Sequence, residues 1–209
     1  LLGREPEIAA LSAFVAAGFE QGSVLLIIGE PGIGKTALLT SGRAVAHEAG
    51  YTLLQAVGVE SEMHLPFGGL HQALTPLMKH LDSLMPTQRD ALATALGLVE
   101  GASPDLFLIA EAAFALICLE QAKHPVIVIV DDVQWLDSQS HQILAFLAHR
   151  GAGTPLSVIG AIRPGHPGPF ADAGFPQLRV TGVDDETADR ILRSHAAALS
   201  PTALKGILE

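Results

Sequence analysis

The sequence is poor in cysteine and in basic residues. Its single cysteine, Cys118, has no partner within the 209 residues, so the chain can form no internal disulfide, as is usual in the reducing cytoplasm. The apolar stretch FALICLEQA around Cys118 predicts that this side chain is buried. Lysine and arginine number 12 against 22 acidic residues, which gives a net charge of −10. Because such a surface repels phosphate backbones, the composition argues against direct DNA binding by this segment.

Long hydrophobic runs and a signal peptide are also missing. The most apolar window, LFLIAEAAFALICL over residues 106–119, is interrupted by Glu111 and is shorter than the roughly 18 residues that a membrane-spanning helix needs. We therefore expect a cytoplasmic protein with no membrane role. The mean hydropathy of +0.39 is high for a free-standing domain. We expect the chain to be a piece of a larger protein. This expectation follows from the high mean hydropathy, from a first residue that is not methionine and from a helix expected at the last residues.

Apolar runs and helical patterns alternate along the chain, which predicts an α/β fold with an open, mostly parallel sheet. Proline and glycine clusters separate them, most densely in the loop over residues 163–176. Ser138 is expected to be the N-cap of its helix. Strands are predicted at residues 24–28, 52–59, 125–130, 156–162 and 177–180, and helices at 4–18, 35–50, 66–97, 105–122, 138–150 and 184–199.

A glycine-rich turn follows the first predicted strand. The sequence GEPGIGKT has the pattern G-x-x-x-x-G-K-[ST] of a phosphate-binding P-loop, and a helix is predicted directly after it. Small residues let backbone N–H groups converge on phosphates, while the positive end of the helix points at them. Lys35 is expected to bridge the β- and γ-phosphates of a nucleotide, and the Thr36 hydroxyl to bind Mg²⁺. The residues assigned to nucleotide binding here are Gly29, Pro31, Gly32, Ile33, Gly34, Lys35, Thr36 and Ala37.

Two acidic residues end the apolar strand VIVIV. Asp131 is expected to hold the Mg²⁺ ion together with Thr36, and Asp132 is placed to polarise an attacking water. Trp135, just after them, is interpreted as a packing anchor for this turn. The strand LSVIGAI is followed by Arg163, which would face the γ-phosphate if this strand lies between the other two. A surface arginine in a Pro/Gly loop is the alternative for Arg163.

Five segments together resemble a known family. LLGREPEIAAL, GEPGIGKTALL, LPFGGLHQALTPL, VIVIVDDVQWLD and VIGAIRP, in this order, are similar to the ATPase domain of the large ATP-binding LuxR-type transcription regulators, in the STAND branch of the AAA+-like P-loop ATPases. The similarity extends over nearly the whole chain. It implies a five-stranded parallel sheet in the order 5-1-4-3-2 and binding of ATP or ADP with Mg²⁺. It also implies that Leu2, Gly3 and Arg4 lie beside the adenine, with Leu2 contacting the base.

The resemblance further implies a domain organisation and partners. Residues 1–182 would form the ATPase core and residues 183–209 the beginning of a helical lid. Full-length relatives carry a sensor region and a C-terminal helix-turn-helix, so DNA would be bound only through a domain outside this segment. An ATP-dependent homo-oligomer is a possible assembly.

The residues leave the activity open between a regulatory switch and an enzyme with real turnover. Fast AAA+ ATPases use glutamate as the catalytic acid, whereas position 132 is aspartate, and a displacement of about 1 Å can cost about a hundredfold in rate. No arginine finger can be identified, a group worth about 10³ to 10⁵ in turnover. We therefore predict a slowly hydrolysing ATP switch with Asp132, Lys35 and Arg163 as its catalytic residues. A P-loop kinase or a motor ATPase is the alternative, and a scaffold without nucleotide is a third hypothesis, which the intact Lys35, Thr36 and Asp131 argue against.

Overall fold

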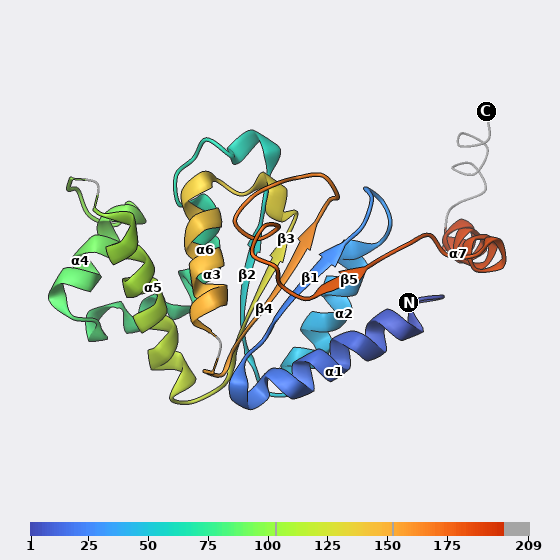
Figure 1. The fold of residues 1–209 in the computed structure, drawn as a ribbon, viewed down its shortest axis with the longest axis horizontal. Coiled ribbons are helices and arrows are strands. Elements are labelled where there is room, and N and C mark those ends of the chain that lie inside the picture. Colours follow the sequence, from blue (N-terminus) through green and yellow to red (C-terminus); the bar gives the residue numbers. More distant parts are fainter. Residues whose placement is uncertain (103, 152, 199–209) are drawn as a thin grey trace.

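Five parallel strands form the centre of the molecule (Figure 1). The computed structural model describes residues 1–102, 104–151 and 153–198. The sheet order β2-β3-β4-β1-β5 is the predicted order 5-1-4-3-2 counted from the opposite edge, so the expected fold class is confirmed. The strands are β1 (Val24–Ile28), β2 (Thr52–Val57), β3 (Val126–Asp131), β4 (Leu156–Ile162) and β5 (Gln177–Arg179).

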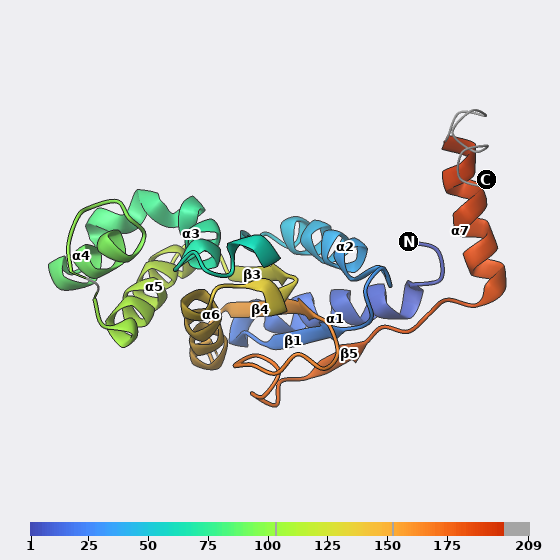
Figure 2. The same cartoon turned by 90° about the horizontal axis from the view of Figure 1, so that it is seen from above.

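Helices cover both faces of this sheet, as Figure 2 shows from above. One face carries α1 and α2, and the other carries α3 and α6, with α4 and α5 packed outside them. The helices are α1 (Glu5–Gln21), α2 (Lys35–Glu48), α3 (Gly68–Leu74), α4 (Pro86–Ala95), α5 (Leu106–Gln121), α6 (Ser138–Arg150) and α7 (Asp185–Ala198), and the 3-10 segments are η1 (Glu60–Glu62), η2 (Thr75–Ser83) and η3 (Val133–Trp135).

The central strands β1, β3 and β4 are almost entirely apolar, because their successive side chains enter two different cores. In β3, Val128 packs with the α3–α6 side, whereas Ile127 and Ile129 pack with α1 and α2. The same alternation separates Val158 from Ile159 in β4. A parallel strand buried on both faces needs a continuous apolar run, which is the pattern seen in VIVIV and LSVIGAI.

Several local expectations need correction. The helical stretch predicted for 66–97 is divided into α3, η2 and α4; Pro76 is the second residue of η2 and Pro86 the first residue of α4. The N-cap of α6 is Asp137, whose carboxylate accepts the Ser140 N–H, so the assignment of Ser138 was wrong. Cys118 is exposed rather than buried. Helix α5 is apolar on nearly all sides, so hydrophobicity alone could not tell its inner face from its outer face.

A buried carboxylate ties α5 to β2 and η2. Glu120 is 4% exposed; it accepts a hydrogen bond from Thr52 Oγ1 at 2.9 Å and lies 2.9 Å from His80 Nε2 and 3.5 Å from Lys79 Nζ. Burial by itself raises the pKa of Glu120, but the hydrogen bonds from His80 and Thr52 and the charge of Lys79 together hold that pKa below its usual value. The carboxylate is therefore ionised in the folded protein and contributes to stability in that form.

Helix α7 lies next to the N-terminus and far from α4 (Figures 1 and 2). The boundary between a core at 1–182 and a lid from 183 stays a prediction, and residues 199–209 of that expected lid lie outside the described residues.

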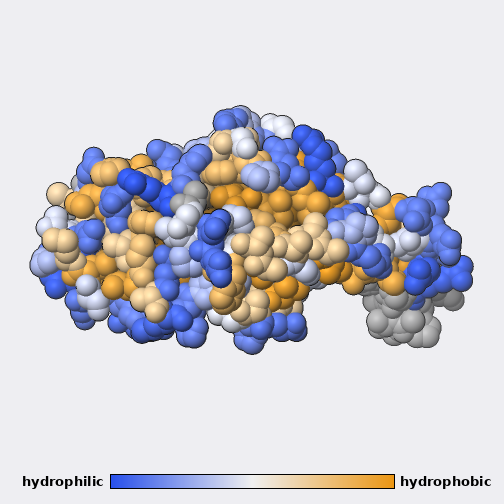
Figure 3. Space-filling model, turned by 60° about the horizontal axis from the view of Figure 1, so that its bottom comes forward, coloured by the Kyte–Doolittle hydropathy of each residue, from blue (hydrophilic) through white to orange (hydrophobic). Residues whose placement is uncertain are grey.

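Among the described helices, none is long and apolar enough to cross a bilayer. Figure 3 shows hydrophobic surface spread between hydrophilic patches on one face of the molecule. Exposed large apolar side chains include Phe19, Met85 and Phe107.

Candidate nucleotide site

The turn between β1 and α2 forms an open cradle. Gly32 and Gly34 have φ of 75° and 102°, which side chains with a Cβ rarely adopt, and no atom lies within 4 Å of where a Cβ would stand at either residue. Gly34 precedes Lys35, the first residue of α2, so the amino end of the helix opens into this space. Backbone N–H groups and a helix N-terminus facing open space are the arrangement that binds phosphate.

Lys35 lies in the cradle with a buried side chain. Its Nζ donates hydrogen bonds to the carbonyl oxygens of Gly29 at 2.8 Å and Glu30 at 3.0 Å, so the ammonium group is held inside the loop. Burial lowers the pKa of Lys35, and the charge of Arg163 lowers it further, while Asp132 and Asp131 oppose the shift. A nearby anion such as a phosphate would offset this cost of burial.

Thr36 and Asp131 meet although they are 95 positions apart. The Thr36 hydroxyl donates to Asp131 Oδ2 at 2.7 Å, which joins the first turn of α2 to the end of β3. The described residues contain no group of three or more His, Cys, Asp or Glu side chains able to hold a metal by themselves. The two oxygen donors suit Mg²⁺, which protein sites typically bind through one or two carboxylates together with substrate phosphates. The site fits an ion that arrives with a nucleotide.

Asp132 turns away from the strand in a left-handed conformation, with φ 45° and ψ 51°. This conformation is uncommon for a residue other than glycine and is tolerated best by Asn and Asp. Its Oδ1 accepts a hydrogen bond from Gln134 Nε2 at 2.7 Å and lies 3.6 Å from Arg163 Nε. The expected catalytic acid and the expected phosphate sensor are thus direct neighbours.

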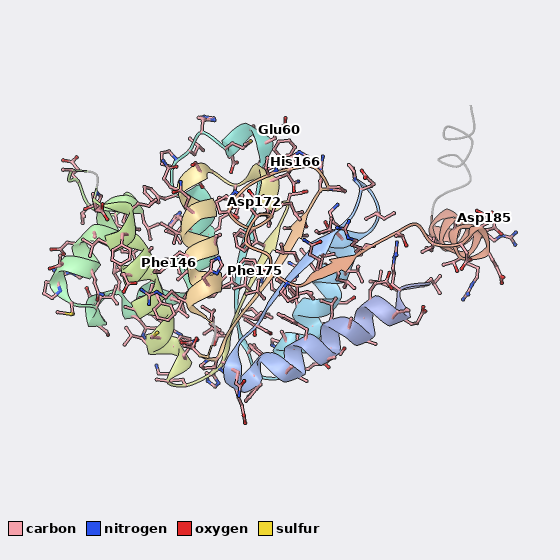
Figure 4. All side chains as sticks on the ribbon, viewed as in Figure 1. Glu60, Phe146, His166, Asp172, Phe175 and Asp185 are labelled. Atoms are coloured by element: carbon pink, nitrogen blue, oxygen red, sulfur yellow. The ribbon has the colours of Figure 1, made fainter. Side chains whose placement is uncertain are left out.

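Arg163 leaves the end of β4 and is only partly exposed. Its guanidinium carbon lies 5.6 Å from the centre of the Trp135 ring, a cation–π distance. Trp135 in turn meets His166 edge to face at 5.7 Å, and His166 belongs to the loop between β4 and β5 together with Asp172 and Phe175 (Figure 4). Trp135 therefore contacts Arg163 and His166, and its interpretation as a packing anchor for its own turn stays a prediction.

Two adjoining cavities lie beside the P-loop. A cavity of about 480 Å³ is lined by Lys35, Thr36, Asp132 and Arg163 together with the P-loop. A second cavity, of about 730 Å³, is lined by Leu2 and Arg4 and by residues that the sequence had not indicated. Both cavities share Gly32, Gly34 and Ala37, so one extended ligand can occupy both. The unexpected lining residues of the second cavity are Leu1, Gly182, Val183 and Ile191.

The remaining predicted residues are placed as follows. Pro31 lines the first cavity and Ile33 the second. The Arg4 side chain donates to the Ile33 carbonyl at 2.9 Å, which fastens the N-terminal segment to the P-loop. Gly3 and Gly29 line neither cavity. A Cβ on Gly3 would lie 2.5 Å from Thr187 Cγ2, so this glycine allows the N-terminal segment to approach α7.

A second network supports the site and was not foreseen. The buried carboxylate of Asp137 accepts backbone N–H bonds from Phe67 at 2.9 Å, Gly69 at 3.1 Å and Ser140 at 2.9 Å. Phe67 is held at φ 62°, a strained value for a large side chain. The segments PFGG and DDVQWLD are therefore parts of one structure. Their polar and glycine residues were visible in the sequence, but their pairing across 70 positions was not.

The fold and this site define a P-loop NTPase of the AAA+ type. The AAA ATPase domain family matches residues 1–159, and the chain belongs to this family. It is therefore an AAA-type P-loop ATPase domain, a class that binds ATP and Mg²⁺. None of the curated protein sequences compared with the chain matches it.

Solved structures of low sequence identity share the fold. A chain of the E. coli MS115-1 HORMA:CdnC:Trip13 complex is 14% identical with a TM-score of 0.56, over 99% of this chain and 72% of that one. The FIGL-1 AAA domain in complex with ADP is 17% identical with a TM-score of 0.52, over 92% and 58%. A DNA replication initiation factor is 13% identical with a TM-score of 0.51, over 94% and 51%. The present chain thus spans just over half the length of the last two.

Proposed function

We propose that this domain is the ATP-binding, slowly hydrolysing switch of a LuxR-type transcription regulator of the STAND branch. The segments shared with those regulators, from LLGRE to VIGAIRP, support this narrower assignment within the AAA family. The position of Asp132 carries the slow-hydrolysis part of the proposal. Its side chain is one methylene shorter than glutamate, and its Oδ1 is hydrogen-bonded to Gln134.

Each residue has a distinct role in the proposed reaction. Water attacks the γ-phosphorus of ATP and the bond to the β,γ-bridging oxygen breaks, which yields ADP and phosphate. Asp132 accepts the proton of the water, and Lys35 offsets the negative charge on the β- and γ-phosphates. Arg163 bonds the γ-phosphate and so distinguishes ATP from ADP. Mg²⁺, held by Thr36 and Asp131, would neutralise the phosphate charge.

The proposed switch acts on regions beyond this segment. Val183 and Ile191, which follow the expected core boundary at 182, line the proposed base cavity together with Leu2. Binding and release of the nucleotide can therefore move α7 relative to the sheet. We propose that this movement reaches the lid, a sensor region and a helix-turn-helix that binds DNA, in a cytoplasmic protein that assembles when ATP is bound.

Binding and turnover test the proposal separately. Lys35→Ala is expected to abolish binding of Mg-ATP in calorimetry, because the buried ammonium group is the main counter-charge in the cradle. Retained micromolar affinity would contradict nucleotide binding at this site. The wild-type chain is expected to hydrolyse ATP more slowly than about 1 s⁻¹ in single turnover, the lower end of ordinary enzyme rates. A faster rate would favour the alternative, a P-loop kinase or motor ATPase with real turnover.

Asp132→Glu tests the reason for the slow rate. The longer side chain is expected to bring its carboxylate about 1 Å further into the cavity and to raise the single-turnover rate about tenfold or more. Asp90→Glu, the same change at an exposed position of α4, serves as a control that leaves the rate unchanged. A rate for Asp132→Glu equal to or below that of the wild type would show that the methylene is not what limits hydrolysis.

A further inference from the structure

One side chain at the site has no role in the proposed reaction. Gln134 lies in η3, between Asp132 and Trp135, and is 8% exposed. A buried amide must find partners for its N–H and C=O groups, and those partners are the two functional residues on either side of it. Its Nε2 donates to Asp132 Oδ1 at 2.7 Å, and its Oε1 accepts the backbone N–H of Arg163 at 3.1 Å.

The bond from the Arg163 N–H joins the two strand ends beyond the last register pair of β3 and β4, whereas the bond to Asp132 is local. The parallel register of the two strands ends with Val130 opposite Gly160. Beyond that point the amide of Gln134 joins the end of one strand to the end of the other. It therefore sets the position of Asp132 relative to Arg163 where the backbone ladder no longer does so.

The position of Arg163 indicates that the Gln134 amide keeps Arg163 from pairing directly with Asp132. Arg163 Nε is buried and has no hydrogen-bond partner among the described residues, although Asp132 Oδ1 lies only 3.6 Å away. A guanidinium and a carboxylate this close ordinarily form a direct, charge-assisted bond of about 2.8 Å. The same oxygen accepts the short bond from Gln134, and this bond orients the carboxylate with Oδ1 at 3.6 Å from Arg163 Nε.

We propose that Gln134 is a positioning residue that keeps Asp132 and Arg163 separate, so that each stays available to the γ-phosphate and its attacking water. This inference rests on the proposed function, because it assigns Asp132 and Arg163 to hydrolysis and to sensing of ATP. Without Gln134, the two charged groups pair and both functions decline together. Two further charged groups lie near Asp132 among the described residues: Lys35 interacts electrostatically with it, and Asp131 Oδ1 accepts the Asp132 backbone N–H at 2.9 Å.

Gln134→Met tests this role, because methionine keeps the length and bulk of the side chain while removing both hydrogen bonds. Single-turnover hydrolysis of Mg-ATP by the purified chain is expected to fall about tenfold, as is usual when a group that supports a catalytic residue is removed. The preference for ATP over ADP in calorimetry is expected to fall as well, while ADP affinity changes less than about twofold. Gln142→Met is the matched control, since Gln142 is exposed and bonds only within α6.

Measuring hydrolysis by Asp132→Asn, with and without Gln134→Met, separates the proposed role of Gln134 from the proposed role of Asp132. If Asp132→Asn slows hydrolysis and Gln134→Met then has no further effect, Gln134 acts through Asp132, as proposed. If Asp132→Asn is slow but Gln134→Met alone hydrolyses at the wild-type rate, only the role of Gln134 is overturned. If Asp132→Asn hydrolyses as fast as the wild type, the proposed role of Asp132 as the catalytic base is itself wrong.

Gln134→Glu provides a second test that keeps the side-chain shape and the bond from the Arg163 N–H. The ionised carboxylate cannot donate to Asp132, whereas the protonated form can. The rate of this variant relative to Gln134→Met is therefore expected to rise as the pH is lowered. A ratio that does not change with pH would mean that the hydrogen bond to Asp132 has no part in positioning, and would overturn the inference even if Gln134→Met folds poorly.

Discussion

Removal of the Asp137 carboxylate should destabilise the protein far more than loss of an ordinary helix cap. Asp137 caps α6 through the Ser140 N–H, and it also holds the turn before α3 through the N–H groups of Phe67 and Gly69. Asp137→Ala leaves these donors without a partner in a place that water reaches poorly. It also releases Phe67 from its strained backbone conformation.

The expected loss follows from the three bonds. A helix cap contributes about 1 kcal/mol, and each further bond to an ionised acceptor contributes about 1.5 kcal/mol or more. Asp137→Ala should therefore lower the free energy of unfolding by about 4 kcal/mol. Asp137→Asn retains Oδ1 but presents an amide nitrogen to the Gly69 N–H, so about half of this loss is expected.

Asp105→Ala is the matched control. Asp105 caps α5 by accepting the N–H groups of Phe107 and Leu108, but it is exposed and bonds only its own helix. Its removal should cost about 1 kcal/mol. Urea unfolding followed by circular dichroism measures both variants. A loss for Asp137→Ala no larger than that for Asp105→Ala would refute the reasoning that the α3 segment depends on this carboxylate.

Three further outcomes are expected. Gly58→Ala places a Cβ 2.2 Å from the Asp132 carbonyl oxygen and should lower the free energy of unfolding by about 1–3 kcal/mol, measured by urea unfolding. Gly42→Ala is the control, because the nearest neighbour of its Cβ would lie 3.8 Å away, and this variant should be neutral or stabilising. Arg163→Ala should weaken ATP binding more than ADP binding in calorimetry, and equal weakening would show that the guanidinium does not sense the γ-phosphate. Glu120→Gln should lower the free energy of unfolding at neutral pH. Because the folded-state pKa of Glu120 lies below the usual 4.5, the difference in stability between the variant and the wild type should persist down to about pH 4.5 and shrink below it. A difference in stability that does not change with pH would contradict the ionised pairing.

The sequence determined the parts of this protein that depend on neighbours along the chain. The spacing GEPGIGKT after VLLII predicted a phosphate cradle, because a buried strand, glycines with positive φ and a helix N-terminus are local features. The acids at the end of VIVIV were located in the same way. The sheet order came from the resemblance to a family rather than from the residues themselves.

Only the tertiary structure decided which distant groups meet and which surfaces are covered. The bond from Thr36 to Asp131, the bridge made by Gln134 and the carboxylate of Asp137 between two helices all join segments that the pattern of residue types does not pair. The outward position of Cys118 was likewise settled by packing, because a helix that is apolar on all sides carries no signal of which face is inside. Local periodicity specifies elements, whereas hydrogen bonds between strand ends depend on how those elements pack.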